Sequence, residues 1–74
     1  MTKPSRFVVC IRNRGYSASL EVFKVYKRLT DPKASRLGLL RVQDESGEDY
    51  LYPDEFFVPL RLPPDALRAL RRRR

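Results

Sequence analysis

Three groups of side chains in this sequence could do chemistry: one thiol, a run of carboxylates, and basic residues interspersed with aromatic ones. The thiol is Cys10, and the chain has no histidine that could deprotonate it. A nucleophilic or redox-sensing cysteine needs a base or another device that lowers its pKa. Cys10 lies in the apolar run 7–11, and free cysteines are commonly buried. We therefore expect a small core residue, with a reactive thiol as the alternative.

The carboxylates are concentrated in one stretch. Six of the nine acidic residues lie between positions 44 and 55, where there is no basic residue: Asp44, Glu45, Glu48, Asp49, Asp54 and Glu55. Neighbouring carboxylates could act as general acid and base or hold a divalent cation. Their spacing does not fit a twelve-residue calcium loop, and Asp-Glu-Ser-Gly at 44–47 is typical of a hairpin tip. We expect a solvated loop; the alternatives are a docking surface for a basic partner and a metal or catalytic site. No cofactor and no metal are predicted.

Basic residues dominate the remainder of the chain. The whole chain has 16 Lys and Arg against 9 Asp and Glu and a formal net charge of +7. The candidate nucleic-acid contacts are Arg12, Arg14, Lys24, Lys27, Arg28 and Arg41. If these residues share one face, they would neutralise phosphates and bind in a salt-dependent way. The four arginines at 71–74 carry four of the seven net charges. A solubilising charge and electrostatic docking to an acidic protein are therefore alternatives.

Aromatic residues provide a second kind of candidate surface. The candidate partner-binding residues are Tyr16, Tyr50, Tyr52 and Phe56. Exposed aromatic side chains are typical anchors of protein interfaces. The alternative is that most of the aromatic residues between 50 and 57 fill the core of a small domain.

Five extended segments must position these residues. Short runs of β-branched and aromatic residues bounded by turn-forming residues predict strands. The predicted strands are residues 7–12, 25–30, 37–43, 48–52 and 57–62. The stretch 20–29 also has the periodicity of an amphipathic helix, but its β-branched and aromatic content favours a strand after an irregular approach at 17–23.

The last strand and the tail have their own patterns. Alternation places Val58, Leu60 and Leu62 on one face of the last strand, and Pro59 suits an edge position because it has no N–H to donate. Asp65 can cap a short helix over 66–70. We expect the four arginines at 71–74 to be disordered, because like charges repel.

The order of these features resembles a known class. Leu20, Lys24 and Tyr26, then Arg-Val-x-Asp-Glu-Ser-Gly-Glu at 41–48, then Tyr52, Pro53 and Phe57 are similar to a set of small bacterial SH3-like barrel proteins of uncharacterised function. The resemblance covers about residues 7–62. It implies a mainly β fold: a small five-stranded SH3-like barrel with a 3-10 turn at 54–56 before the last strand, followed here by the short C-terminal helix. It assigns no catalytic or binding residues. The chain lacks the tryptophan prominent in the groove of proline-binding SH3 domains.

The sequence thus predicts one domain, with a flexible start at 1–6, the barrel at 7–62, and a helix and arginine tail at 63–74. We expect a non-catalytic binding module that engages a protein partner through surface charge and aromatics. The alternative is a nucleic-acid-binding accessory protein that uses the basic residues and the arginine tail. The longest apolar run, residues 7–11, is far too short to span a membrane, so we expect a cytoplasmic protein with no membrane partner. The oligomeric state stays open.

Overall fold

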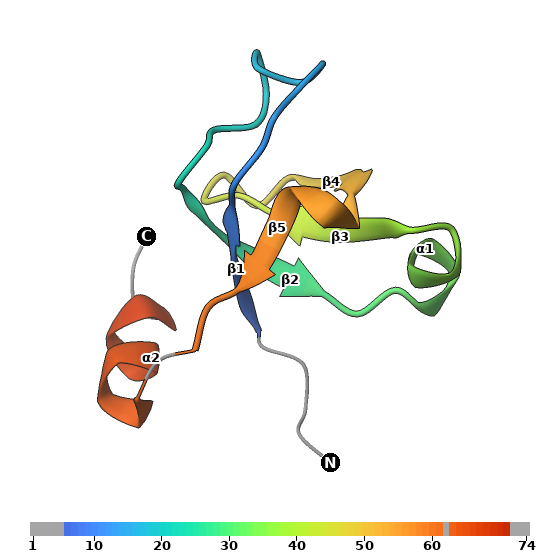
Figure 1. Cartoon of the computed structure of the whole chain (residues 1–74). Coiled ribbons are helices and arrows are strands. Elements are labelled where there is room, and N and C mark those ends of the chain that lie inside the picture. The colour runs from blue at the N-terminus through green and yellow to red at the C-terminus, as the bar shows by residue number, and fades with distance from the viewer. Residues whose placement is uncertain (1–5, 62, 72–74) are drawn as a thin grey trace.

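The fold is built on one antiparallel sheet of five strands. The computed structural model describes residues 6–61 and 63–71. The strands are β1 (Phe7–Cys10), β2 (Val25–Leu29), β3 (Leu39–Gln43), β4 (Asp49–Pro53) and β5 (Phe57–Pro59), paired in the order β4-β3-β2-β1-β5. Two helices, α1 (Pro32–Arg36) and α2 (Pro64–Arg71), and the 3-10 turn η1 (Asp54–Phe56) complete it. The predictions of a mainly β fold, five strands, a 3-10 turn before the last strand and a short C-terminal helix are confirmed (Figure 1).

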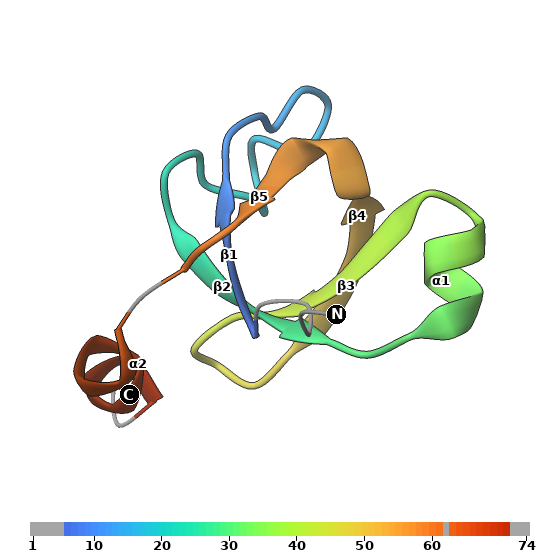
Figure 2. The same ribbon diagram turned by 60° about the horizontal axis from the view of Figure 1, so that its bottom comes forward.

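The sheet is strongly curved, so that β4 and β5, its two edge strands, face each other across the interior (Figure 2). They are consecutive in the chain and are joined directly by η1. Within residues 6–61 and 63–71 no ladder of strand hydrogen bonds joins β4 to β5. The SH3-like barrel therefore stays a prediction.

Strand boundaries differ from the predicted ones where a backbone group finds another partner. The first strand ends at Cys10, not at residue 12, and the Ile11 N–H donates to the carbonyl of Phe56 in η1 at 2.7 Å. The last strand ends at Pro59; residue 62 lies outside the described residues. Both edge strands end in a proline, which costs no ladder bond on an unpaired edge.

The inward face of the last strand is the one that does not carry Val58. Phe57 is the buried residue of β5, and Val58 is exposed. Phe57 lies opposite Cys10 of β1, which is itself in the core, so the inward face of β5 includes position 57. Alternation along a strand then directs Val58 outward.

Helix α1 was not predicted, although its start has a recognisable pattern. Asp31 is the N-cap, and its carboxylate accepts the Ala34 N–H at 3.0 Å; Pro32 follows at the first helical position. Both residue types are preferred at these positions. The helix buries Ala34, and its C-cap Leu37 and the following Gly38 belong to the turn after it, so the strand predicted at 37–43 begins at Leu39. A helix of five residues has too few apolar positions to show periodicity.

The core lies inside the curve of the sheet, and it includes one residue from the irregular segment between β1 and β2. Its members are Val8, Cys10, Leu20, Tyr26, Val42, Tyr52, Phe56 and Phe57. Leu20 is only 1% exposed. As predicted, the segment 17–23 is irregular and the strand begins after it. The helix predicted at 66–70 runs from Pro64 to Arg71, so Asp65 lies in its first turn instead of capping it, and Arg71 is helical instead of disordered; residues 72–74 lie outside the described residues.

Candidate functional site

The thiol is part of the core. Cys10 is fully buried, and its Sγ donates to the carbonyl of Arg12 at 3.0 Å. Burial raises the pKa of this thiol, because the low-polarity interior disfavours the thiolate. The prediction of a core residue is confirmed by this burial.

The acidic loop forms a hairpin tip whose carboxylates are engaged locally. Gly47 takes a φ of 90°, and its N–H donates to the carbonyl of Asp44 at 3.1 Å. The Asp44 carboxylate accepts the Ser46 N–H at 2.9 Å and its hydroxyl, and these bonds lower the pKa of Asp44. Glu45 pairs with Lys24 of the segment before β2, which lowers the pKa of Glu45. In the described part of the chain, no three acidic or cysteine side chains converge as metal ligands would.

Two of the six predicted nucleic-acid contacts are ion-paired. Lys24 binds Glu45, and Arg41 donates to Asp31 at 2.8 Å and to Asp49 at 2.7 Å. Arg41 thereby ties the N-cap of α1 to β4 across β3. These contacts reduce the positive potential that a phosphate would meet at both positions.

The other four basic residues lie on different parts of the fold. Arg12 and Arg14 are exposed in the segment that follows β1, and Arg12 Nη1 contacts the carbonyl of Glu55 at 3.5 Å. Lys27 and Arg28 are consecutive on β2, so their side chains leave opposite faces of the sheet. Lys27 is exposed, whereas Arg28 is half-buried beside a pocket. The structure thus spreads these residues over several surfaces.

The four predicted aromatic residues, by contrast, come together. Tyr16 belongs to the segment between β1 and β2, yet its ring lies edge-on to Tyr52 of β4, with centroids 5.1 Å apart, and to Phe56 of η1 at 6.1 Å. The ring centroid of Tyr50 lies 6.0 Å from that of Tyr52. We call Tyr16, Tyr50, Tyr52 and Phe56 the aromatic patch. Within the patch, Tyr52 and Phe56 are buried, while Tyr16 and Tyr50 are 41% and 36% exposed.

Hydrogen bonds fix both sides of the aromatic patch. The Tyr52 hydroxyl donates to Ser19 Oγ at 3.0 Å, which holds the segment carrying Tyr16 against β4. The Tyr50 hydroxyl donates to Glu48 at 2.5 Å. That bond to a carboxylate raises the pKa of Tyr50 to about 12, because ionised tyrosine could not donate it. The exposed rings of Tyr16 and Tyr50 are therefore both held in place by contacts with neighbouring residues.

Hydrogen bonds also hold the part of this segment that follows Tyr16, at Leu20 and Glu21. The Tyr16 carbonyl accepts the N–H of Leu20 at 2.8 Å, and the Leu20 carbonyl accepts Asn13 Nδ2 at 2.9 Å. The Tyr26 hydroxyl accepts the Glu21 N–H at 3.0 Å. Because Leu20 is buried in the core, these bonds position Tyr16 relative to the sheet.

Phe23 is an exposed aromatic residue that the sequence analysis did not single out. Its side chain is 81% exposed, and its φ is +68°, a left-handed backbone conformation that bulky residues rarely adopt. The Phe23 N–H donates to the carbonyl of Cys10 at 2.7 Å, which holds the strained turn. In the sequence, Phe23 is one of the apolar positions of the amphipathic pattern at 20–29, and such a position does not predict an exposed side chain.

Comparison with protein-family models, curated proteins and solved structures gives no match for this chain. None of the helices in the described residues is long and apolar enough to cross a membrane. Among the predicted site residues, those of the aromatic patch are the ones that the fold brings together.

Proposed function

We propose that this chain is a non-catalytic binding module, an SH3-like barrel that binds an extended segment of a protein partner on the aromatic patch. The strand order, the turn η1 between β4 and β5, and the long connection between β1 and β2 support the barrel. The observation that carries the function is the convergence of Tyr16, from the segment between β1 and β2, with the aromatic residues of β4 and η1.

The physical case rests on area and preorganisation. Tyrosine rings offer a large contact area with little rotamer freedom to lose, so they are effective interface anchors. Here the two exposed rings are already held by contacts with buried aromatic residues and, for Tyr50, by a hydrogen bond to Glu48. Binding an apolar side chain between them needs little further ordering.

Charge favours a protein over a nucleic acid as the partner. Lys24 and Arg41 are paired with carboxylates, and Glu48 lies at the aromatic patch through its bond to Tyr50. A carboxylate beside the stacking surface repels a phosphate backbone. It also offers a pairing site for a basic residue of a peptide.

The test is selection from a random peptide library on the immobilised chain, followed by affinity measurements on the selected peptides. Substituting Tyr16 or Tyr50 by Ala should weaken binding about 30-fold, the effect of removing an interface anchor of about 2 kcal/mol. Leu51→Ala is the matched control, because Leu51 is similarly exposed on β4 but alternates to the other face of the sheet.

Two results would overturn the proposal. One is a failure to enrich any peptide; the other is an equal loss of affinity in Leu51→Ala and Tyr50→Ala. Binding to an oligothymidylate that weakens steeply with salt, and that Arg12→Gln with Arg14→Gln abolishes, would support the nucleic-acid alternative instead.

A further inference from the structure

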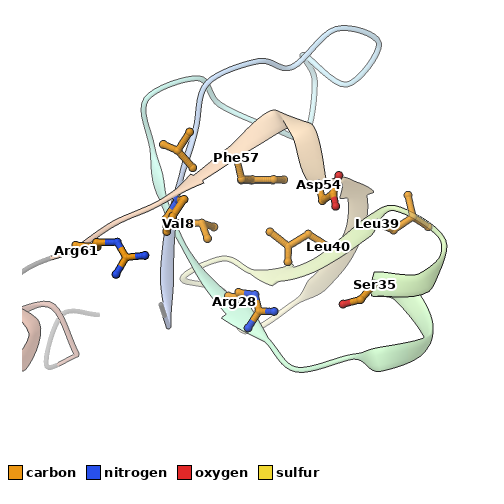
Figure 3. A pocket seen from close by; sticks show the side chains of 10 residues that line it. Val8, Arg28, Ser35, Leu39, Leu40, Asp54, Phe57 and Arg61 are labelled. Carbon is orange, nitrogen blue, oxygen red and sulfur yellow. The ribbon is translucent and has the colours of Figure 1, made fainter. Parts of the chain in front are cut away.

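A second surface, separate from the aromatic patch, lies where the interior of the curved sheet opens to solvent. Here a pocket of about 290 Å³ reaches the core between β1, β3 and β5. It shares no residue with the aromatic patch. Its apolar floor comes from Val8, Leu40 and Phe57, three residues on three different strands (Figure 3).

The rim of the pocket is polar and carries two guanidinium groups. Arg61, after β5, lies at one end of the opening, Ser35 of α1 and Asp54 of η1 lie at the other end, and Arg28 of β2 lies between them (Figure 3). Over residues 6–61 and 63–71, neither Arg28 nor Arg61 forms an ion pair. This distinguishes them from Lys24 and Arg41, which are neutralised by carboxylates.

Two like charges beside one apolar pocket are complementary to an anion attached to an apolar group. A carboxylate accepts hydrogen bonds from guanidinium groups in a favourable planar geometry. The volume lies just below the range of about 300–1,000 Å³ typical of pockets for drug-sized ligands, so the apolar group is small. One aliphatic side chain is suited to this space.

The end of the rim at Ser35 and Asp54 offers a further contact. The Asp54 carboxylate and the Ser35 hydroxyl can both accept a hydrogen bond from a ligand that carries an N–H donor beside its carboxylate. The last residue of a polypeptide supplies all three features: a carboxylate, a side chain, and a backbone N–H. Capture of a terminal carboxylate is a recognised mode of peptide binding.

We propose that this pocket binds the C-terminal residue of a partner polypeptide whose last side chain is aliphatic. Arg28 and Arg61 bind the terminal carboxylate, the side chain packs on Val8, Leu40 and Phe57, and Asp54 or Ser35 accepts the backbone N–H. This site works independently of the aromatic patch.

The experiment is a titration of the full chain, followed by amide chemical shifts, with the peptide acetyl-Gly-Ser-Gly-Ser-Leu bearing either a free carboxylate or a terminal amide. The free acid should shift the amide signals of Val8, Leu40 and Phe57 and bind at least tenfold more tightly than the amide. Replacing the last Leu by Gly should abolish saturable binding, because the apolar contact is lost.

Substitutions of the two arginines test where the peptide's terminal carboxylate binds. Arg61→Gln and Arg28→Gln should each weaken the free acid at least tenfold and leave the amide unchanged. Lys27→Gln is the control: Lys27 neighbours Arg28 on β2 and carries the same charge, but it does not line the pocket. Because Arg61 is exposed, its replacement keeps the test valid even if Arg28→Gln does not fold.

Three comparisons of affinity would overturn the proposal. They are equal affinity for acid and amide, equal weakening by Lys27→Gln and Arg61→Gln, and tighter binding of octanoate than of the free-acid peptide, which would indicate a lipid-like carboxylate. Shifts confined to Tyr16 and Tyr50 would also overturn it, while supporting the aromatic patch. Loss of the patch in Tyr16→Ala leaves this titration unchanged, so the two proposals fail separately.

Discussion

Replacing Leu20 by Ala tests whether one side chain holds the irregular segment between β1 and β2 in place. Leu20 is among the largest fully buried side chains, although it belongs to no strand or helix. Leu→Ala substitutions in protein cores cost about 2–5 kcal/mol, the transfer free energy plus the energy of the cavity left behind. At roughly 0.05–0.15 kcal/mol per residue, the whole chain has a stability of about 4–11 kcal/mol. The substitution should therefore remove a large share of the free energy of unfolding.

The assay is urea unfolding at 25 °C, followed by far-ultraviolet circular dichroism. With a slope of about 1 kcal/mol per M for so small a domain, the midpoint should fall by about 2 M or more. The control is Val22→Ala, an exposed position of the same segment, which should change the stability by less than about 1 kcal/mol. A loss below 1 kcal/mol for Leu20→Ala, or one no larger than that of Val22→Ala, would refute the reasoning that the core fixes the position of Tyr16.

The remaining predictions concern strain, pH and the thiol. Phe23→Gly should leave the free energy of unfolding unchanged or raise it by up to about 1 kcal/mol, because glycine adopts positive φ without strain and little buried area is lost. A loss above about 1 kcal/mol in urea unfolding would instead show that the Phe23 side chain packs on the fold. A backbone N–H of α1 and the Arg41 guanidinium lower the pKa of Asp31, so its contribution is present above its ordinary pKa of 3.8 and is lost as the pH falls. Asp31→Asn keeps the capping oxygen, and its stability should fall less between pH 5 and pH 2; identical slopes would contradict this. Cys10 should react with a disulfide reagent only as fast as the protein opens, and prompt reaction in native buffer would contradict its burial.

The sequence by itself determined the local structure wherever the pattern was local. β-branched and aromatic runs predicted all five strands, since these residues suit a half-buried, pleated surface. The tip at Gly47 followed from turn-forming residues, whereas the 3-10 turn η1 was expected only from the resemblance to SH3-like barrels. The burial of Cys10 followed from its apolar neighbours. The boundaries were less accurate, because strand ends depend on distant partners such as the carbonyl that receives the Ile11 N–H.

Only the tertiary structure decided which surfaces exist. Tyr16 and Tyr52 are far apart in the chain, and their contact depends on how the segment before β2 folds back onto β4. Likewise, no local pattern shows that Arg41 is paired with the carboxylates of Asp31 and Asp49, while Arg61 has no carboxylate partner among residues 6–61 and 63–71. Charge counts along a sequence add residues together, whereas electrostatic effects depend on the distance between charges and their exposure to solvent. For that reason the sequence suggested one shared basic face, whereas the fold spreads those basic residues over several surfaces and places two arginines beside a pocket.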